Sequence, residues 1–144
     1  MDKNLTVEVS VTINADIAKV WDALVNPAMI KQYLFGTNAI SDWKVGSTIT
    51  YKGGWEGKEY EDHGKILQIE PEKILKTTYW SSMSGTKDTP ENYVTITYSV
   101  ARVGNGTLLT IIQDNSKTEE AKEHSGSNWK MVLTTLKDLL EKSE

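Results

Sequence analysis

The sequence predicts an α+β protein of the helix-grip type, in which a curved antiparallel seven-stranded sheet wraps around one long C-terminal helix. Two observations support this prediction: residues 117–142 carry apolar side chains at helical spacing, and most of the preceding chain has the pattern of strands. A helix with one apolar stripe must bury that stripe, and the sheet is its available partner. We expect one domain over residues 1–144, with two short helices after the first strand.

The predicted C-terminal helix, residues 117–142, is apolar on one face only. Its stripe follows the spacing i, i+3, i+4, i+7, i+10 and i+11 through Trp129, Val132, Leu133, Leu136, Leu139 and Leu140. Ser116 and Glu119 have the S-x-x-E spacing of a capping box, which predicts where the helix starts. The half before Asn128 is polar except for Ala121. We expect that half to be solvated; the alternative is that it borders an opening.

The first strand and the two short helices are predicted from a change of period. Apolar residues alternate with polar ones over residues 5–13, which indicates a strand with one buried face. Helical spacing follows over residues 17–24, and Asn26-Pro27 ends that helix. Because proline is well tolerated at a first helical position, a second helix is expected over residues 27–34, ending before Gly36.

Six further strands are predicted between these helices and the last one. They cover residues 37–42, 47–55, 58–69, 73–80, 91–102 and 107–114. Glu56-Gly57 and Gly104-Asn105-Gly106 are predicted hairpin turns, and residues 81–90 form a polar loop. Because the connections are short, consecutive strands are expected to pair antiparallel.

Composition and charge exclude several classes of function. The chain has no cysteine and two histidines, so we expect no disulfide, no metal site and no cofactor. A net charge of −4 with dispersed acids disfavours nucleic acid as a partner. No apolar run has the length of a membrane span and the N-terminus lacks an apolar leader, so we expect a cytoplasmic protein. No G-x-S-x-G, P-loop or G-x-G-x-x-G motif occurs.

The aromatic residues suggest a binding site. The chain has five Trp and six Tyr but one Phe, and Trp and Tyr combine an apolar ring with a polar group that needs a partner. Such side chains suit a cavity wall, although ordinary core packing is an equal alternative. The candidate ligand-binding residues are Tyr33, Tyr51, Tyr60, Trp80, Tyr98 and Trp129.

No residue is assigned a catalytic role. His63 follows Asp62, but neighbours on a strand point to opposite faces, so His63 is expected to face water if Gly64 and Ile66 face the helix. His124 is expected on the helix surface. If the protein is an enzyme, Asp62 or Gln113 is the best candidate for an inward acid or base.

Several motifs, in order, resemble one known family. They are Ala18-Lys19-Val20-Trp21 with Asn26-Pro27, Ile30 to Tyr33, Gly64-Lys65-Ile66 through Glu70-Pro71 with Leu75 and Trp80, Thr107 to Thr110, and Trp129, Leu133 and Leu136. The pattern is similar to the START-like, birch-pollen-allergen-like (SRPBCC) superfamily. Within it, the chain resembles the branch named after the C-terminal domain of the activator of the heat-shock chaperone ATPase. The family usually has glycine before the helix tryptophan, whereas this chain has Asn128.

This resemblance implies a fold more firmly than an activity, because one fold hosts many functions. Superfamily members bind lipids, sterols, flavonoids or polyketides in a cavity under the last helix, and some are cyclases or hydratases. We therefore expect a small hydrophobic or aromatic ligand to bind between the sheet and the C-terminal helix. The alternatives are a cyclase- or hydratase-type enzyme using the same cavity, and a domain whose partner is a chaperone.

Overall fold

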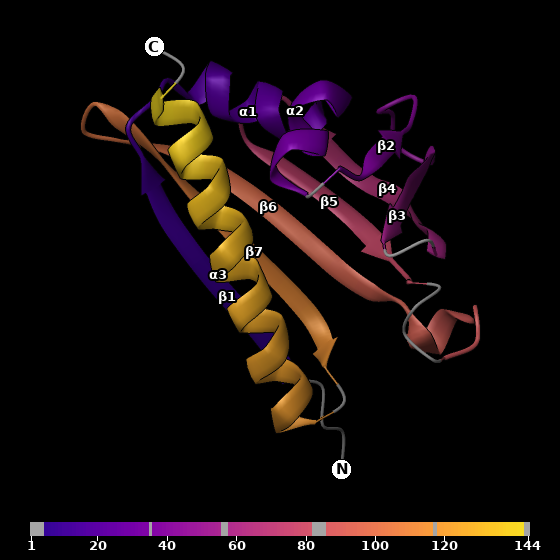
Figure 1. Ribbon diagram of the computed structural model, residues 1–144. Coiled ribbons are helices and arrows are strands. Elements are labelled where there is room, and N and C mark those ends of the chain that lie inside the picture. Colours follow the sequence, from indigo (N-terminus) through magenta and orange to yellow (C-terminus); the bar gives the residue numbers. More distant parts are fainter. Residues whose placement is uncertain (1–4, 35, 56–57, 82–85, 117, 143–144) are drawn as a thin grey trace.

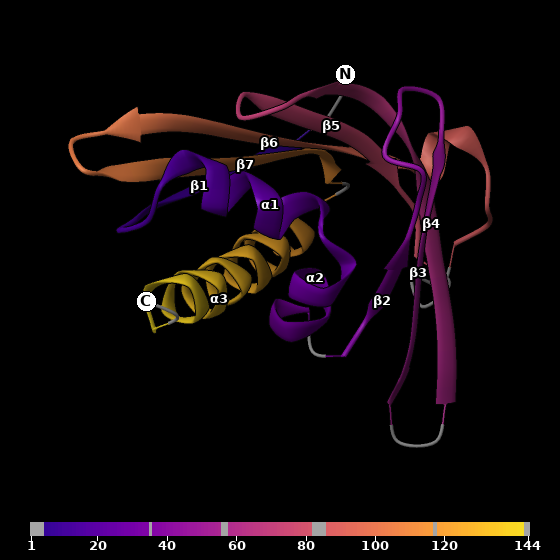
Figure 2. The same cartoon turned by 90° about the horizontal axis from the view of Figure 1, so that it is seen from above.

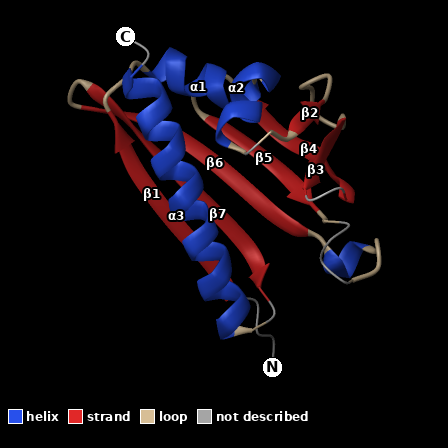
Figure 3. Cartoon of the chain, viewed as in Figure 1, coloured by secondary structure: helices blue, strands red, loops and turns tan. Residues whose placement is uncertain are grey.

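The computed structural model of the protein describes residues 5–34, 36–55, 58–81, 86–116 and 118–142. Its helices and strands follow the predicted order (Figures 1 and 3). In chain order they are β1 (Leu5–Ile13), α1 (Ile17–Val25), α2 (Pro27–Tyr33), β2 (Asn38–Ile40), β3 (Thr48–Trp55), β4 (Lys58–Glu70), β5 (Ile74–Tyr79), the 3-10 turn η1 (Pro90–Asn92), β6 (Val94–Val103), β7 (Gly106–Ser116) and α3 (Glu119–Lys142).

The seven strands form one antiparallel sheet in the order β1-β7-β6-β5-β4-β3-β2. Seen from above, the sheet is strongly bent: β1, β7, β6 and β5 form one wall, and β4, β3 and β2 turn away to form the other (Figure 2). The helices lie in the angle between these walls. The predicted helix-grip fold is confirmed.

The bend of the sheet lies at β4, the strand between β3 and β5. The register of β4 against β5 shifts between Ile66 and Gln68, which is a β-bulge. Gly64 allows the close approach there, because a Cβ at this position would lie 1.7 Å from the carbonyl oxygen of Thr78. Any side chain at position 64 would therefore push β5 away from β4.

Helix α3 lies along β1 and β7, on one side of the sheet (Figure 1). Its second half buries Val132, Leu133, Leu136 and Leu140 against this part of the sheet. Helices α1 and α2 close the same end of the molecule, with α1 packed on β6 and β7 and α2 packed on α3 and β2. The dry core is therefore concentrated at the end where all three helices meet.

Two local predictions need correction. The N-terminal cap of α3 is Thr118, whose Oγ1 accepts a hydrogen bond from the Ala121 amide at 3.0 Å. The Ser116 capping box was wrong: Ser116 ends β7, and its buried hydroxyl makes no hydrogen bond to any described residue. The sixth strand begins at Val94 and not at residue 91, because Pro90–Asn92 forms the turn η1. The predicted Glu56-Gly57 turn lies outside the described residues.

Candidate functional site

A cavity of about 650 Å³ opens between the first half of α3 and the inner face of the sheet. Its walls come from β3, β4, β5, β6 and β7, from the segment after α2, and from Ser125 to Val132 of α3. It exists because α3 covers β1 and β7 while the sheet bends away from the helix at β4. Pockets for small molecules are typically 300–1,000 Å³, so the cavity has the size of a ligand site.

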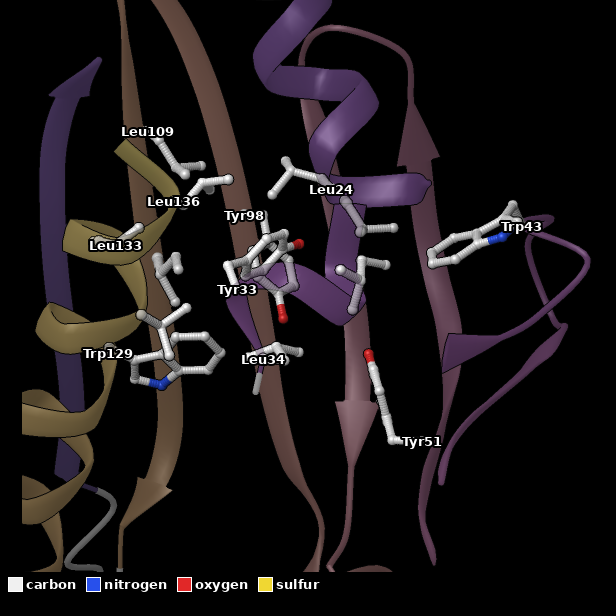
Figure 4. A pocket seen from close by; sticks show the side chains of 14 residues that line it. Leu24, Tyr33, Leu34, Trp43, Tyr51, Tyr98, Leu109, Trp129, Leu133 and Leu136 are labelled. Atoms are coloured by element: carbon white, nitrogen blue, oxygen red, sulfur yellow. The ribbon is translucent and has the colours of Figure 1, made fainter. Parts of the chain in front are cut away.

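The space continues toward α1 and α2, but there it is filled. A void of only about 20 Å³ remains, enough for little more than one water molecule. Figure 4 shows Leu133, Leu136 and Trp129 pointing from α3 toward Tyr33, Tyr98 and Leu24 around this void. The side chains at this end are mostly aliphatic and complete the core.

Tyr98 and Trp129 form the boundary between the filled end and the open cavity. Their rings pack edge to face with centroids 6.0 Å apart, which joins β6 to α3. The Trp129 Nε1 donates a hydrogen bond to Gln113 Oε1 at 2.8 Å, and Gln113 Nε2 donates to Ser125 Oγ at 3.4 Å. The polar group of the indole is thereby satisfied without turning the ring away from the cavity.

Asp62 brings a carboxylate to the cavity wall from β4. It is only 7% exposed, and it accepts hydrogen bonds from the Tyr79 hydroxyl at 2.6 Å and from Ser81 Oγ at 2.9 Å. Tyr51 packs edge to face against Tyr79, with ring centroids 5.8 Å apart. The acid is therefore oriented by two hydroxyl groups and lies beside two aromatic rings.

Burial raises the pKa of the hydroxyl groups of Tyr51, Tyr79 and Tyr98 well above their ordinary value. The nearby Asp62 charge raises the pKa of Tyr51 and Tyr79 further, and for Tyr79 its hydrogen bond to Asp62 acts in the same direction. These tyrosines therefore remain protonated and available as hydrogen-bond donors at neutral pH.

The cavity lining contains five of the six candidate residues: Tyr51, Tyr60, Trp80, Tyr98 and Trp129. The Tyr60 hydroxyl bonds with Thr37 Oγ1 at 2.5 Å, and its ring lies over Gly53, where a Cβ would come within 2.3 Å of that hydroxyl.

Tyr33 and Trp80 have surroundings that differ from those of the other four candidates. Tyr33 lines the filled end, and its hydroxyl donates to the Ala23 carbonyl at 2.8 Å, which is a core role. Trp80 borders the cavity, but its ring packs against His63, with centroids 5.3 Å apart. Trp80 and His63 are bridge partners, so their side chains share the outer face of the sheet.

Sequence reasoning missed Tyr79 as a wall residue. Because side chains alternate along β5, Tyr79 lies on the same face as Leu75 and Thr77, opposite Trp80. Leu75 and Thr77 are both buried, so this face points inward. The alternation of side chains along β5 was the signal that could have identified Tyr79.

Asp62 and Gln113 do face inward, as expected for the best acid or base candidates. In α3, Ser125 and Asn128 border the cavity while Glu123 is exposed, so the polar half is solvated on one side and lines an opening on the other.

A second polar cluster lies on the outer face. His63 Nε2 pairs with Asp88 Oδ2 at 2.8 Å, and the Tyr93 hydroxyl donates to Asp88 Oδ1 at 2.5 Å. These bonds lower the pKa of Asp88, with the Tyr93 hydrogen bond as the largest cause. Burial and the same bond raise the pKa of Tyr93 to about 12. As predicted, His63 points away from the cavity, and its ring contacts Asp88 and Tyr93.

Within the described ranges, no group of three His, Cys, Asp or Glu is arranged to hold a metal ion. None of the helices described has the length and hydrophobicity needed to cross a membrane.

Comparison with known proteins identifies the family. The family described as Activator of Hsp90 ATPase homolog 1-like protein matches residues 14–141. The solution structure of ChR145 from Cytophaga hutchinsonii shares 46% identity, covers 99% of this chain and 97% of its own, and superposes with a TM-score of 0.87. A search of curated proteins found no match.

Two more distant structures share the fold. MLL2253 from Mesorhizobium loti is 22% identical, with 97% of this chain and 99% of its own covered and a TM-score of 0.80. The Aha1 dimer from Colwellia psychrerythraea is 23% identical, with 95% and 96% covered and a TM-score of 0.72. The family match spans most of the chain, and the motifs of the two short helices and of α3 fall within it. The chain therefore belongs to the family of Activator of Hsp90 ATPase homolog 1-like proteins, within the START-like superfamily that its sequence resembles.

Proposed function

We propose that the protein binds a small, mostly apolar molecule in the cavity between α3 and the sheet. The observation that carries this proposal is the 650 Å³ cavity itself, walled by Tyr51, Tyr79, Tyr98 and Trp129. An apolar wall with a few fixed polar groups is the usual composition of a small-molecule site. A cavity needed only for folding would be filled like its neighbour, since empty apolar space in a core is destabilising.

The experiment is a screen of the purified protein against apolar and aromatic compounds by NMR shift mapping. A cavity ligand should shift the signals of Tyr98 and Trp129 together, because their rings touch across β6 and α3. It should also raise the melting temperature, because a ligand that binds only the folded protein stabilises it. At a ligand concentration one hundred times Kd, the free energy of unfolding should rise by about 2.7 kcal/mol. Shifts confined to the loop after β5 and to the outer residues Thr6 and Thr12 would contradict the proposal.

A matched pair of tyrosine variants separates the two faces of the molecule. Tyr98→Ala removes a cavity ring and should weaken binding, whereas Tyr93→Ala removes an outer ring that contacts His63 and should leave affinity unchanged. Equal affinity losses in the two variants would mean that the ligand does not occupy the cavity.

A second candidate function is an enzyme of the cyclase or hydratase type that uses the same cavity. The observation that favours it is the inward Asp62 carboxylate, oriented by Tyr79 and Ser81 as a general acid or base would be. Each ligand found should be incubated with the wild-type protein and with Asp62→Asn and followed by mass spectrometry. Conversion that depends on Asp62 supports an enzyme, and a ligand recovered unchanged from both contradicts it.

A further inference from the structure

Four tyrosine hydroxyls gather at the inner end of the cavity. Burial is the largest cause of the raised pKa of Tyr98, and the charges of Tyr51, Tyr33 and Tyr79 add to it, which places the four oxygens in one region. Two of these hydroxyls have an acceptor: Tyr33 donates to a backbone carbonyl of α1, and Tyr79 donates to Asp62. Among the residues that the structure describes, the hydroxyls of Tyr51 and Tyr98 have none.

The hydroxyls of Tyr51 and Tyr98 touch open space inside the protein. Burial is the largest cause of the raised pKa of both, so their oxygens lie in the interior. Within the described ranges, Ser116 Oγ is the one fully enclosed side-chain oxygen or nitrogen without a hydrogen bond, so the two tyrosine oxygens are not enclosed. Both tyrosines line the cavity and the small void that continues it. Two hydrogen-bond donors are therefore presented where the cavity meets the packed core.

The two tyrosines come from the two walls of the bent sheet. Tyr51 belongs to β3 and Tyr98 to β6, and Figure 4 shows both side chains at the same pocket. Each ring is held in place, because Tyr51 packs edge to face on Tyr79 and Tyr98 packs edge to face on Trp129. A ligand that bonds to these hydroxyls therefore orders no mobile side chain when it binds.

A carbonyl oxygen is the group that fits two such donors. It has two lone pairs and no proton, so it can accept one hydrogen bond from each tyrosine. The raised pKa keeps both hydroxyls protonated at neutral pH. The described lining of the cavity contains no Lys, Arg or His. Because a buried anion without a cation costs more than two neutral hydrogen bonds return, a neutral acceptor is favoured over a carboxylate.

We propose that the cavity selects apolar or aromatic molecules that carry a ketone-type carbonyl, whose oxygen accepts hydrogen bonds from the Tyr51 and Tyr98 hydroxyls. The carbonyl lies at the inner end of the cavity. The apolar body extends past Trp129 toward Met131, which lines the cavity and is 52% exposed. This inference rests on the proposed ligand-binding function and adds the chemical class of the ligand and the two residues that select it.

The test compares two probes of the same shape. They are methyl naphthyl ketone and isopropenylnaphthalene, in which a methylene group replaces the carbonyl oxygen. Their dissociation constants for the wild-type protein are measured at neutral pH by NMR titration. The ketone should bind about tenfold tighter, which is the effect expected of one to two net hydrogen bonds.

Phenylalanine variants assign the selectivity to the two hydroxyls. Tyr51→Phe and Tyr98→Phe each keep the ring and remove one hydroxyl, so each should reduce the ketone affinity about threefold and leave the hydrocarbon affinity unchanged. The double variant should bind the two probes equally. Tyr93→Phe is the matched control: it removes a hydroxyl that bonds to Asp88 on the outer face, and it should change neither affinity.

The melting temperatures of the free variants give a second check. Tyr51→Phe and Tyr98→Phe remove hydroxyls without an acceptor in the described chain, so neither should lower the melting temperature. Tyr79→Phe removes a hydrogen bond to Asp62 and should lower it. A clear loss in both Tyr51→Phe and Tyr98→Phe would mean that these hydroxyls already bond within the protein, which would overturn the proposed carbonyl contact.

The outcomes distinguish this inference from the proposed function. Equal affinities for the two probes in the wild type overturn the carbonyl selectivity while the cavity function stands. A ketone preference that survives in the double variant, or is lost in Tyr93→Phe, overturns the role of the two hydroxyls. If neither probe binds, the cavity function fails and the selectivity fails with it.

Discussion

The two halves of α3 lie on the same sheet, but the space beneath the second half is filled by side chains and the space beneath the first half is open. In the second half, Leu133, Leu136 and Leu140 are at most 2% exposed, and the space beside them is reduced to about 20 Å³. In the first half, Ser125, Asn128 and Trp129 border a cavity of about 650 Å³. The filled half has α2 as an extra packing partner and accepts a hydrogen bond at Leu140 from Lys19 of α1, whereas the open half faces the bend of the sheet. The packed core and the proposed binding site thus lie at different ends of one helix.

Removing α3 should have the largest effect on this comparison. A chain ending at Asn115 would expose the inner face of β1 and β7, where Val7, Val9, Leu109 and Ile111 are buried. We expect it to aggregate or to bind a hydrophobic dye, because burial of apolar area is the main favourable term in folding. A soluble protein of this length with well-dispersed NMR signals would contradict the assignment of the core to the helix.

Single substitutions should separate the two halves of α3. Leu136→Ala should lower the free energy of unfolding by about 2–5 kcal/mol, through lost burial and the cavity left behind. Glu123→Ala, in the exposed polar half, should cost less than about 0.5 kcal/mol. Denaturant midpoints measure both values. Similar losses in the two variants would mean that the buried face of α3 is assigned wrongly.

Two glycine substitutions should change stability in opposite directions. Gly64→Ala places a Cβ against the Thr78 backbone at the sheet bend and should cost about 1–3 kcal/mol. Gly126→Ala, in the interior of α3, meets Val7 Cγ1 at an ordinary 3.7 Å and should stabilise the protein by about 0.5–1 kcal/mol. Thermal melts of both variants test this. A neutral Gly64→Ala would show that the close strand approach is not needed.

The smallest expected effect concerns the outer cluster. The folded-state pKa of Asp88 lies below its ordinary value, so its contribution to stability is present above that ordinary value and is lost as the pH falls through the folded pKa. The stability difference between the wild type and Asp88→Asn should therefore shrink below pH about 4. Urea titrations between neutral and acidic pH measure this difference. A difference that widens on acidification would contradict the role of Asp88.

The sequence was sufficient to predict the fold because its periods are local. The alternation of β1 and the stripe from Trp129 to Leu140 each follow from neighbouring residues alone, and together they require a sheet under a helix. The start of α3 was harder to place, because Ser116 and Thr118 are both reasonable caps. In the structure Ser116 is the last residue of β7, and Thr118 makes the cap hydrogen bond.

The site could be predicted only in part. Tyr51, Tyr98 and Trp129 were chosen as candidates because each combines an aromatic ring with a polar group, and in the structure all three line one cavity. Whether that cavity is open depends on the bend of β4, which arises from a bulge and from the fit of Gly64 against Thr78. Such long-range packing leaves no periodic mark in the sequence. The outer position of the Trp80 ring likewise follows from its pairing with His63, 17 residues earlier in the chain.

The most direct test of the open half is to locate a bound apolar probe by intermolecular nuclear Overhauser effects. Naphthylethanol, which is neutral, tests the cavity independently of its charge. We expect contacts from the naphthyl protons to Tyr98, Trp129 and Val132, which line the cavity from β6 and α3. Contacts to Thr6 and Thr12 on the outer face of β1, or no contact with any of the three cavity residues, would contradict it.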